Sequence, residues 1–364
     1  MKKLCFVDRI GPHYRSEVFQ LIDRSFPTDF FFGDATDGIK TLDYRLLSNV
    51  TVLHTIRGRH LSFQKGFVSL LYKPYSHYVL PGETRSVSLW LFLLIAMFFP
   101  KKQVYLWSHG FYGRESFGEK LLKRVLFSLP NGGTFVYGDY AKRLMIKAGI
   151  NSQKIIPIYN SLAYSKQLSI RNQIREKQIY QAHFENSFPT VIAICRIEKR
   201  KKVDLLIDVL SLYPNLNLVL VGSGSYLPII KEMTSNKGLE KRVWFYGACY
   251  DEYKNAELLY NADLCVIPGD IGLTAIHSLM FGTPVITHDR FSSQGPEFEA
   301  IVPDISGAFY HFGDAAHLVS VIRNWFRGHN NRIEIRTKCY EIVDTKWNPD
   351  NQVRILKQHI SLEN

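Results

Sequence analysis

Apolar and polar residues alternate along the chain in blocks that predict a regular series of strands and helices. Short runs of Val, Ile, Leu and Phe are typical of strands buried on both faces of a parallel sheet, and most are followed by a segment with apolar residues at helical spacing. In the first part of the chain, the predicted strands are 4–7, 30–32, 51–54, 78–80, 104–107, 134–137 and 155–159, and the predicted helices are 15–24, 86–98, 118–127 and 140–148.

A second series of strands and helices follows a polar, weakly patterned stretch, 162–187. Repeated strand–helix alternation predicts a parallel sheet with helices on both faces, so the expected fold class is α/β. The predicted strands of this series are 190–194, 216–221, 243–246, 264–267, 285–287 and 307–310, and its helices are 203–212, 226–233, 252–261, 272–280, 315–326 and 353–360.

At 364 residues, the chain is longer than one hydrophobic core usually supports. We therefore expect two Rossmann-like domains with a cleft between them, which is a common place for ligands. The expected boundaries are 1–165 for the first domain, 166–187 for a linker, 188–340 for the second domain and 341–364 for a C-terminal segment whose helix packs back across the domains.

Positive charge is concentrated in the first half of the chain. The net charge is +12, and residues 1–160 hold 22 Lys and Arg against 11 Asp and Glu, whereas the rest is nearly neutral. A basic domain beside a neutral one is typical of a protein that meets an anionic membrane surface, a phosphorylated substrate or a nucleic acid. No nucleic-acid-binding motif accompanies the charge, so we expect no nucleic-acid partner.

The apolar run 90–99 is about half as long as a membrane-spanning helix and lies between two predicted strands. We predict a buried helix, with partial insertion at a bilayer surface as the alternative. Residues 1–7 lack the apolar core of a signal sequence, and the five scattered cysteines lack the spacing of metal ligands. The sequence therefore predicts a cytoplasmic protein with reduced thiols, able to associate peripherally with the inner face of the cytoplasmic membrane.

The segment 262–288 is the most informative one for chemistry. It predicts a buried strand, a turn that contains Gly269, Asp270 and Gly272, a helix that begins near Leu273 and Thr274, and a second buried strand. A Gly-rich turn that opens a helix at the carboxyl end of a strand favours an anionic ligand, because free backbone N–H groups and the helix dipole point at it. An ordinary strand–helix connection without a ligand is the alternative.

Three other strand ends of the second series should lie at the same edge of the sheet. Arg196 follows the first strand, and Lys201 lies in a basic run, 199–202, that could neutralise a diphosphate, although a solvated basic loop has the same pattern. Glycines after the next two strands would let a ligand approach the backbone closely. These glycines are Gly222, Gly224 and Gly247.

Taken in order, these features resemble the retaining GT-B-fold glycosyltransferases of family 4, the group 1 transferases. The family has a Gly-Arg pair, a lysine five residues later and an Asp-Leu-Leu helix start, which here are Cys195-Arg196, Lys201 and 204–206. The resemblance covers most of 188–312. Further matching blocks are 221–224, 243–247, 262–263, 272–273 and 281–287, and looser ones are 12–15, 107–110, 159–161 and 347–349.

The resemblance implies a GT-B fold, in which two Rossmann-like domains face each other across a cleft, and a nucleotide-diphosphate sugar as the donor. Arg196 and Lys201 would grip the diphosphate and stabilise the leaving nucleotide, and backbone N–H groups at Leu273 and Thr274 would help. The family chemistry proceeds with retention and needs no cofactor and no essential metal.

Other predicted contacts also depend on the resemblance. His109 would project from the first domain towards the donor sugar, although a structural histidine at a strand end is the alternative. Gly11 would let the chain pass close to the diphosphate. The residues after Gly247, namely Ala248 and Tyr250, would flank the nucleobase.

One departure from the family pattern bears on the donor. The family carries two glutamates with seven residues between them, and the aligned residues here are Gly269 and His277. A carboxylate can accept from two ribose hydroxyls, whereas a neutral imidazole offers one acceptor and one donor. Either Asp270 replaces the first carboxylate, or the donor differs, or activity is lost. A carboxylate could also come from Glu299 or Glu297.

The function predicted from these features is transfer of a sugar to a lipid-linked or soluble glycan acceptor in bacterial surface polysaccharide biosynthesis. The basic first domain would meet the anionic membrane surface. A nucleotide-sugar epimerase or hydrolase on the same fold, and a non-catalytic nucleotide-binding homologue, are the alternatives.

Overall fold

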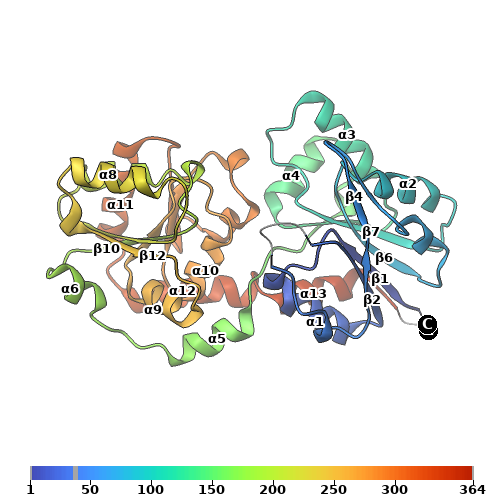
Figure 1. Ribbon diagram of the computed structural model, residues 1–364, viewed down its shortest axis with the longest axis horizontal. Coiled ribbons are helices and arrows are strands. Elements are labelled where there is room, and N and C mark those ends of the chain that lie inside the picture. Colours follow the sequence, from blue (N-terminus) through green and yellow to red (C-terminus); the bar gives the residue numbers. More distant parts are fainter. Residues whose placement is uncertain (1, 36–39, 363–364) are drawn as a thin grey trace. The chain divides into compact units, whose positions relative to one another are not determined.

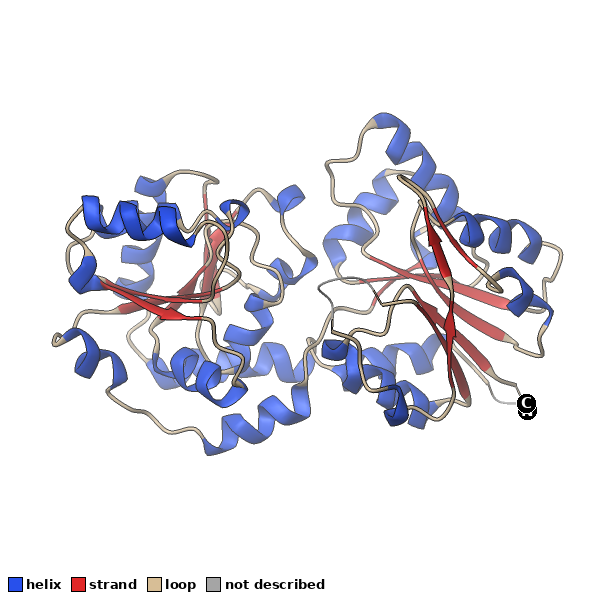
Figure 2. Ribbon diagram, viewed as in Figure 1, coloured by secondary structure: helices blue, strands red, loops and turns tan. Residues whose placement is uncertain are grey.

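Two parallel sheets organise the chain, one in each of two units (Figure 1). The computed structural model describes residues 2–35 and 40–362. Unit 1 consists of Met1–Ala163 together with Asn348–Asn364, and unit 2 is Tyr164–Trp347. In both units, helices cover the two faces of the sheet (Figure 2), which confirms the predicted α/β fold class.

Unit 1 contains a seven-stranded parallel sheet in the order β3-β2-β1-β6-β7-β8-β9. Alternate residues of β1 enter different cores, with Cys5 and Val7 on one face and Leu4 and Phe6 on the other. Burial on both faces explains why the strands are continuous apolar runs. The strands are β1 (Leu4–Asp8), β2 (Thr28–Gly33), β3 (Val50–Leu53), β6 (His77–Pro81), β7 (Gln103–Ser108), β8 (Gly133–Val136) and β9 (Ile155–Pro157).

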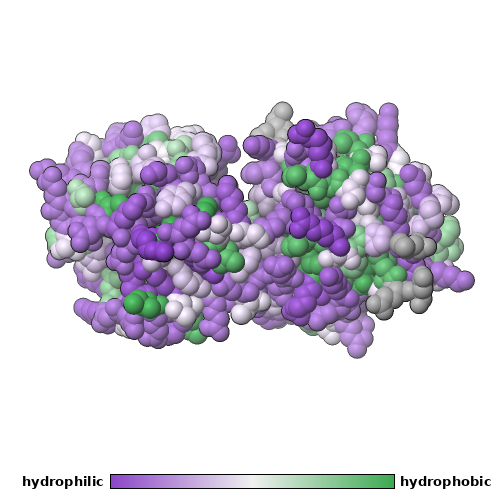
Figure 3. All heavy atoms as spheres, turned by 90° about the horizontal axis from the view of Figure 1, so that it is seen from below, coloured by the Kyte–Doolittle hydropathy of each residue, from purple (hydrophilic) through white to green (hydrophobic). Residues whose placement is uncertain are grey.

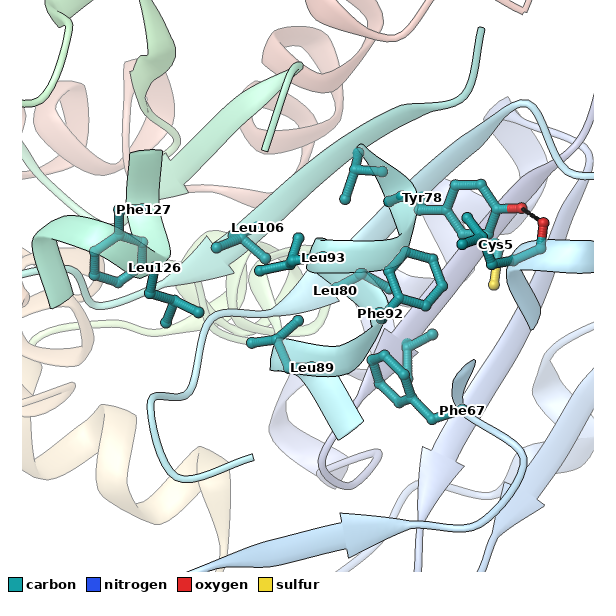
Figure 4. Close-up of a cluster of buried hydrophobic side chains, with 14 of the residues drawn as sticks. Cys5, Phe67, Tyr78, Leu80, Leu89, Phe92, Leu93, Leu106, Leu126 and Phe127 are labelled. Carbon is teal, nitrogen blue, oxygen red and sulfur yellow. Dashed lines mark hydrogen bonds between the residues drawn. The ribbon is translucent and has the colours of Figure 1, made fainter. Parts of the chain in front are cut away.

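Helices α2 (Val87–Ala96), α3 (Phe117–Ser128) and α4 (Asp139–Lys147) cover one face of this sheet. Figure 4 shows how buried side chains of α2 and α3 pack against those of β1, β6 and β7. Helices α1 (Ser16–Ser25) and α13 (Pro349–His359) cover the other face. All predicted helices of this part are present, with ends shifted by a few residues.

Helix α2 is buried on one side only, which corrects part of the prediction for 90–99. Leu89, Phe92 and Leu93 lie in the core, whereas Leu91 and Leu94 are 43% and 49% exposed. Among the residues that the structure describes, no helix combines the length and the apolar character needed to cross a membrane.

Unit 2 contains a six-stranded parallel sheet in the order β12-β11-β10-β13-β14-β15. The direction of strand succession reverses between β10 and β13, and this reversal is the switch point of an open α/β sheet. The strands are β10 (Thr190–Ile194), β11 (Asn217–Val221), β12 (Val243–Gly247), β13 (Leu264–Val266), β14 (Val285–His288) and β15 (Gly307–Tyr310). The helices are α5 (Tyr164–Gln173), α6 (Ile179–Phe184), α7 (Asp204–Leu212), α8 (Leu227–Asn236), α9 (Glu252–Asn261), α10 (Thr274–Met280), α11 (Ala315–Gly328) and α12 (Arg332–Thr345).

Several elements were not assigned individually from the sequence, among them helices α5 and α6 in the polar stretch 162–187. A short antiparallel hairpin, β4 (Thr55–Arg57) with β5 (Ser62–Gln64), lies apart from the main sheet of unit 1. Helix α12 was missed because its buried face includes a charged residue. Arg336 is buried, donates from Nη2 to the carbonyl of Tyr260 at 2.7 Å and stacks 3.7 Å from the Tyr260 ring, so burial there depends on a partner and not on an apolar side chain.

Helix α13 completes the core of unit 1. Gln352 connects this helix to the loop after β9. The Oε1 of Gln352 accepts from Ser161 Oγ at 2.6 Å, and its Nε2 donates to the Tyr159 carbonyl at 2.8 Å. The helix packs against α1, and its apolar side chains join the same core. The buried residues are Val353, Ile355, Leu356 and Ile360.

We predict that Leu356→Ala lowers the stability of unit 1 by about 2–5 kcal/mol, because Leu356 is fully buried and its truncation leaves a cavity. Hydrogen exchange of the β1 and β6 amides would measure the change. Lys357→Ala, on the exposed side of the same helix, is the control and should change stability by less than about 0.5 kcal/mol. Equal effects of the two substitutions would contradict the placement of α13.

Candidate functional site

Two loops meet at the carboxyl edge of the unit 2 sheet, on either side of its switch point. The loop after β10 carries Lys201, and the loop after β13 carries Gly269 and Asp270. The Gly269 N–H donates to the Lys201 carbonyl at 2.9 Å, and Lys201 Nζ donates to the Asp270 carbonyl at 2.5 Å. Two of the predicted donor-site residues therefore lie together, and they do so at the crevice where open α/β sheets bind ligands.

Asp270 is held by partners on both sides. Its Oδ2 accepts from Arg200 Nη1 at 3.0 Å, and its Oδ1 accepts from the Gly295 N–H at 2.9 Å. Lys201 Nζ lies 3.7 Å from Oδ2. Both carboxylate oxygens are thus engaged within the protein. Arg200 was missed as a member of this site, although the basic run 199–202 was the signal that contained it.

Three of the five cations of the loop after β10, namely Arg196, Arg200 and Lys201, differ in how tightly their side chains are held. The side chain of Lys201 is buried, whereas that of Arg196 is 74% exposed and reaches only Glu198, at 3.5 Å. Glu198 also accepts from Arg200 Nε at 2.9 Å, and this bond, with the nearby cations, holds the pKa of Glu198 below its usual value. Lys201 is therefore fixed in place, and Arg196 can turn towards an anion.

Gly269 has no room for a side chain. A Cβ at this position would lie 2.1 Å from the Arg200 carbonyl oxygen and 2.8 Å from Lys201 Cα. Distances this short would force the two loops apart. The first glutamate of the family pattern therefore cannot occupy position 269 in this structure. We call the turn after β13, residues 268–272, the elbow, and any carboxylate that acts there must come from another position.

A second carboxylate lies close to the elbow. One point beside Gly295, where its Cβ would lie, is 2.7 Å from Glu297 Oε2, 3.6 Å from Asp270 Oδ1 and 3.7 Å from Gly272 Cα. Glu297 is buried, whereas Glu299 on the same turn is partly exposed. The structure therefore gathers Asp270 and Glu297 around this point.

His277 contacts a carboxylate supplied by another helix. Its Nε2 donates to Glu252 Oε1 at 2.9 Å, and Gln167 Nε2 donates to the same oxygen at 2.9 Å. Burial opposes ionisation of Glu252, but the His277 and Gln167 hydrogen bonds hold its pKa below the usual value. An acidic group thus lies beside the position of the missing second glutamate, at the start of α9, directly after the segment expected to flank the nucleobase.

The glycines after β11 serve the fold of the loop after β10. A Cβ at Gly222 would lie 1.9 Å from the Cys195 carbonyl oxygen, and one at Gly224 would lie 2.2 Å from that of Ile197. These positions are therefore packed against backbone. Farther along the edge, Gly247 and Ala248 precede Tyr250, whose side chain is 94% exposed and available for stacking.

The first turn of α10 is tied to the central strand. Thr274 Oγ1 donates to the Ile194 carbonyl at 3.0 Å, and Ile271 N–H donates to Gln294 Oε1 at 2.9 Å. Gly272 has φ +55° with open space where a Cβ would lie, and Leu273 precedes the helix. These contacts hold the elbow rigid, and the donation of backbone N–H groups at 273 and 274 to a phosphate stays a prediction.

His109 and Gly11 belong to unit 1 and lie at the carboxyl edge of its sheet. His109 is an exposed residue, and its ring lies tilted against the Tyr137 ring with 4.6 Å between the ring centroids. Desolvation by the surrounding protein, together with the Arg15 and Lys123 cations, lowers the pKa of His109 to about 4, so the ring is neutral at pH 7. A Cβ at Gly11 would lie 2.6 Å from the Leu42 side chain, so Gly11 is packed against protein.

His288, at the end of β14, is a buried neutral histidine near the elbow. Its Nδ1 accepts from the Arg290 N–H at 3.1 Å, and its ring packs edge-on against Phe312 at 4.6 Å. Burial lowers the pKa of His288 to about 4, and the Arg290 and Lys202 cations contribute. It was not identified from the sequence, where it reads only as the end of an apolar strand.

Comparison with known proteins places these features in a family. Residues 174–341, which span most of unit 2, match the family model described as "Glycosyl transferases group 1". Unit 2 therefore contains a segment similar to the group 1 glycosyltransferases, which we call the group 1 domain. This confirms the resemblance found in the sequence.

The group 1 domain has a curated relative and several solved counterparts. "Alpha-monoglucosyldiacylglycerol synthase" of Streptococcus pneumoniae (strain ATCC BAA-255 / R6) is 27% identical over 171 residues, which is 44% of this chain and 36% of that protein. The match therefore spans about a third of the relative's length.

Solved structures resemble the whole chain. Anabaena Alr3699/HepE in complex with UDP has a TM-score of 0.74 at 17% identity, and covers 98% of this chain and 99% of its own. The lipopolysaccharide outer core galactosyltransferase WaaB, in its apo form, has a TM-score of 0.74 at 14% identity, with 98% and 100% covered. These likenesses establish the GT-B fold, as expected from the sequence.

We predict that Gly269→Ala destabilises the group 1 domain by about 1–3 kcal/mol or more, because the added methyl group overlaps the backbone at Arg200 and Lys201. Hydrogen exchange of the β13 and β14 amides would report the change. Gly328→Ala, at the end of α11 with nothing near its Cα, is the matched control and should leave exchange unchanged. A neutral Gly269→Ala variant would show that the two loops are not in contact.

The stability of the same domain should fall as the pH is lowered from about 6.5 towards 4. The unfolded chain takes up a proton on His288 near the ordinary histidine pKa of 6.5, whereas the folded protein resists it down to about 4. The contribution is at most about 1.4 kcal/mol per pH unit and is fully present above pH 6.5. His288→Gln should reduce the difference in β14 exchange stability between pH 7 and pH 5. An undiminished difference would show that His288 protonates freely in the folded state.

Proposed function

We propose that this protein is a retaining glycosyltransferase that moves a sugar from a nucleotide-diphosphate donor to a lipid-linked glycan acceptor, in the biosynthesis of a surface polysaccharide. The observation that supports it most is the contact between the loops after β10 and β13, because it brings Lys201 and the glycine elbow together at the switch point of unit 2. The family-model match of residues 174–341 and the GT-B fold support the reaction class.

The cations of this edge suit a diphosphate leaving group. As the bond between the anomeric carbon and the phosphate oxygen breaks, negative charge develops on the diphosphate, and the fixed Lys201 ammonium and the free Arg196 guanidinium would stabilise it. Two cations in this position would supply the charge neutralisation for which other enzymes use a metal ion, so we propose that the reaction needs no metal and no cofactor.

Uridine is the base that the comparisons favour. HepE has been solved with UDP and with UDP-glucose, and so a UDP-hexose is the first donor to test. We propose that Tyr250 stacks on the base and that the Glu252–His277 pair takes the place of the missing ribose-binding glutamate. Asp270 or Glu297 would take the part of the other glutamate towards the sugar.

The acceptor and the place of action follow from weaker support. The curated relative is named as a glycolipid synthase, and unit 1 carries most of the net positive charge of the chain. We propose that the enzyme acts at the inner face of the cytoplasmic membrane, where an anionic bilayer attracts unit 1 and presents the acceptor. His109, neutral at pH 7, would face the donor sugar as a hydrogen-bonding group.

Calorimetric titration with UDP, GDP and dTDP, followed by transfer assays with the matching sugar nucleotides and vesicles that contain lipid acceptors, would test the proposal. We expect binding of UDP and acceptor-dependent release of UDP in the presence of EDTA, with retention of the anomeric configuration by NMR. Rapid turnover of the donor without an acceptor would instead indicate an epimerase or hydrolase. Binding of a nucleotide without any turnover would indicate a non-catalytic homologue.

We predict that Arg196→Ala and Lys201→Ala each lower kcat/KM for transfer by about 100-fold or more, because each removes a cation from the developing diphosphate charge. Steady-state kinetics with the accepted donor would measure the loss. Lys199→Ala is the matched control, since Lys199 is an exposed cation of the same loop, and it should change kcat/KM by less than about threefold. Similar losses in all three variants would show that the loop acts only through its net charge.

A further inference from the structure

Helix α3 carries an apolar stripe that the protein core does not use. Phe117, Leu121, Leu122 and Val125 are 86%, 53%, 45% and 46% exposed. Their spacing of three, four and one residues places them on one side of the helix, whereas Leu126 and Phe127 pack into the core on the other side. The helix is therefore apolar on two faces, and only one of them is covered by unit 1.

Helix α2 repeats this arrangement. Its ten residues include no charged residue, and such an all-round apolar helix is normally buried on every side. Here only one face is buried. The outer face exposes Leu91 and Leu94, and the turn that follows exposes Met97 and Phe98, at 63% and 83%.

The two stripes belong to one surface. The strands β6, β7 and β8 are neighbours, and α2 and α3 connect them in turn, so both helices lie side by side on the same face of the sheet (Figure 1). We call the outer side of these helices the α2–α3 surface. It consists of Leu91, Leu94, Met97, Phe98, Phe117, Leu121, Leu122 and Val125. Figure 3 shows one side of each unit, where hydrophilic residues predominate and apolar residues form separate patches.

Basic residues accompany the α2–α3 surface. The segment 85–128 contains seven Lys and Arg and two Glu. Glu115 and Glu119 lie 2.7 and 3.7 Å from Lys123, so that one lysine offsets part of their charge. The remaining cations include five exposed side chains. They are Arg85, Lys101, Arg114, Lys120 and Arg124.

We propose that the α2–α3 surface inserts into the leaflet that faces the protein in an anionic phospholipid bilayer and docks unit 1 on it. Two helices that lie side by side with apolar side chains outward and cations beside them have the pattern of in-plane membrane binding, in which apolar groups enter the acyl boundary and cations meet anionic headgroups. A protein partner of ordinary polarity would leave this excess of positive charge unpaired. This docking proposal rests on the proposed function in one respect, since a lipid-linked acceptor explains why the enzyme would need to reach a bilayer.

A fluorescent reporter on the surface would test the insertion directly. Phe117→Trp should show a blue shift and a rise in emission with vesicles of 30% phosphatidylglycerol in phosphatidylcholine, and quenching by brominated lipids, since position 117 is the most exposed of the stripe. Ile333→Trp, at a position of unit 2 that is 76% exposed, is the matched control and should show none of these changes. Equal responses at the two positions would overturn the proposal.

Vesicle co-sedimentation separates the apolar and the electrostatic parts. We expect Leu121→Ser/Val125→Ser to lower the partition coefficient by about tenfold or more, and Lys120→Glu/Arg124→Glu to lower it on anionic vesicles and to reduce its salt dependence. Leu212→Ser, an exposed leucine of unit 2, should bind as the wild type does. Equal binding by the wild type and the Leu121→Ser/Val125→Ser variant would contradict the surface assignment.

The binding assays contain no donor, so they are independent of catalysis. Arg196→Ala should bind vesicles like the wild type, and a protein that binds vesicles without transferring sugar would overturn the proposed function while leaving the surface proposal intact. Light scattering in the absence of lipid tests whether a second copy of the chain covers the α2–α3 surface instead. A wild-type dimer that Leu121→Ser/Val125→Ser converts to a folded monomer would show that a second copy covers the surface, and the membrane proposal would be wrong.

Discussion

The site of unit 2 depends on a backbone contact between the loops after β10 and β13. The Gly269 N–H reaches the Lys201 carbonyl, and the Lys201 ammonium reaches the carbonyl of Asp270. Because the two backbones touch, no side chain fits at position 269. The same contact fixes Lys201 at the switch point and brings Asp270 to Arg200. The departure from the family motif is thus a geometric consequence of this contact and is compatible with an intact anion site.

The two units carry different parts of the chemistry. Unit 2 gathers cations and glycine turns at one sheet edge, which suits a diphosphate, and it places the Glu252–His277 pair beside the segment that ends in Tyr250. Unit 1 holds the neutral His109 at the edge of its own sheet. Two of its helices, α2 and α3, expose apolar side chains with cations beside them. The proposed phosphate site of unit 2 and the proposed lipid-binding surface of unit 1 would together suit transfer to a lipid-linked glycan.

The sequence predicted most strands and helices because burial on both faces of a parallel sheet leaves a plain record of apolar runs. The prediction from sequence failed where a charged side chain is buried by bonding to a partner, and where an element is very short. Helix α12 hides Arg336 through bonds to Tyr260, and the hairpin of β4 and β5 is too short for a clear pattern. From the sequence, Gly222 was expected to let a ligand approach the backbone, whereas in the structure it makes room for the Cys195 carbonyl.

By itself, the sequence determined the α/β fold class, the resemblance of unit 2 to the group 1 glycosyltransferases and the order of the glycine and basic segments along one sheet edge, because these depend on local pattern and on the parallel arrangement of strands. The tertiary structure alone decided which side chains meet. Asp270 with Arg200, Glu252 with His277 and Glu297 with the elbow are pairs between distant segments, and no local pattern encodes them. The structure also decided that α2 buries only one face. A helix that is apolar on all sides has no polar stripe in its sequence that would show which face is exposed.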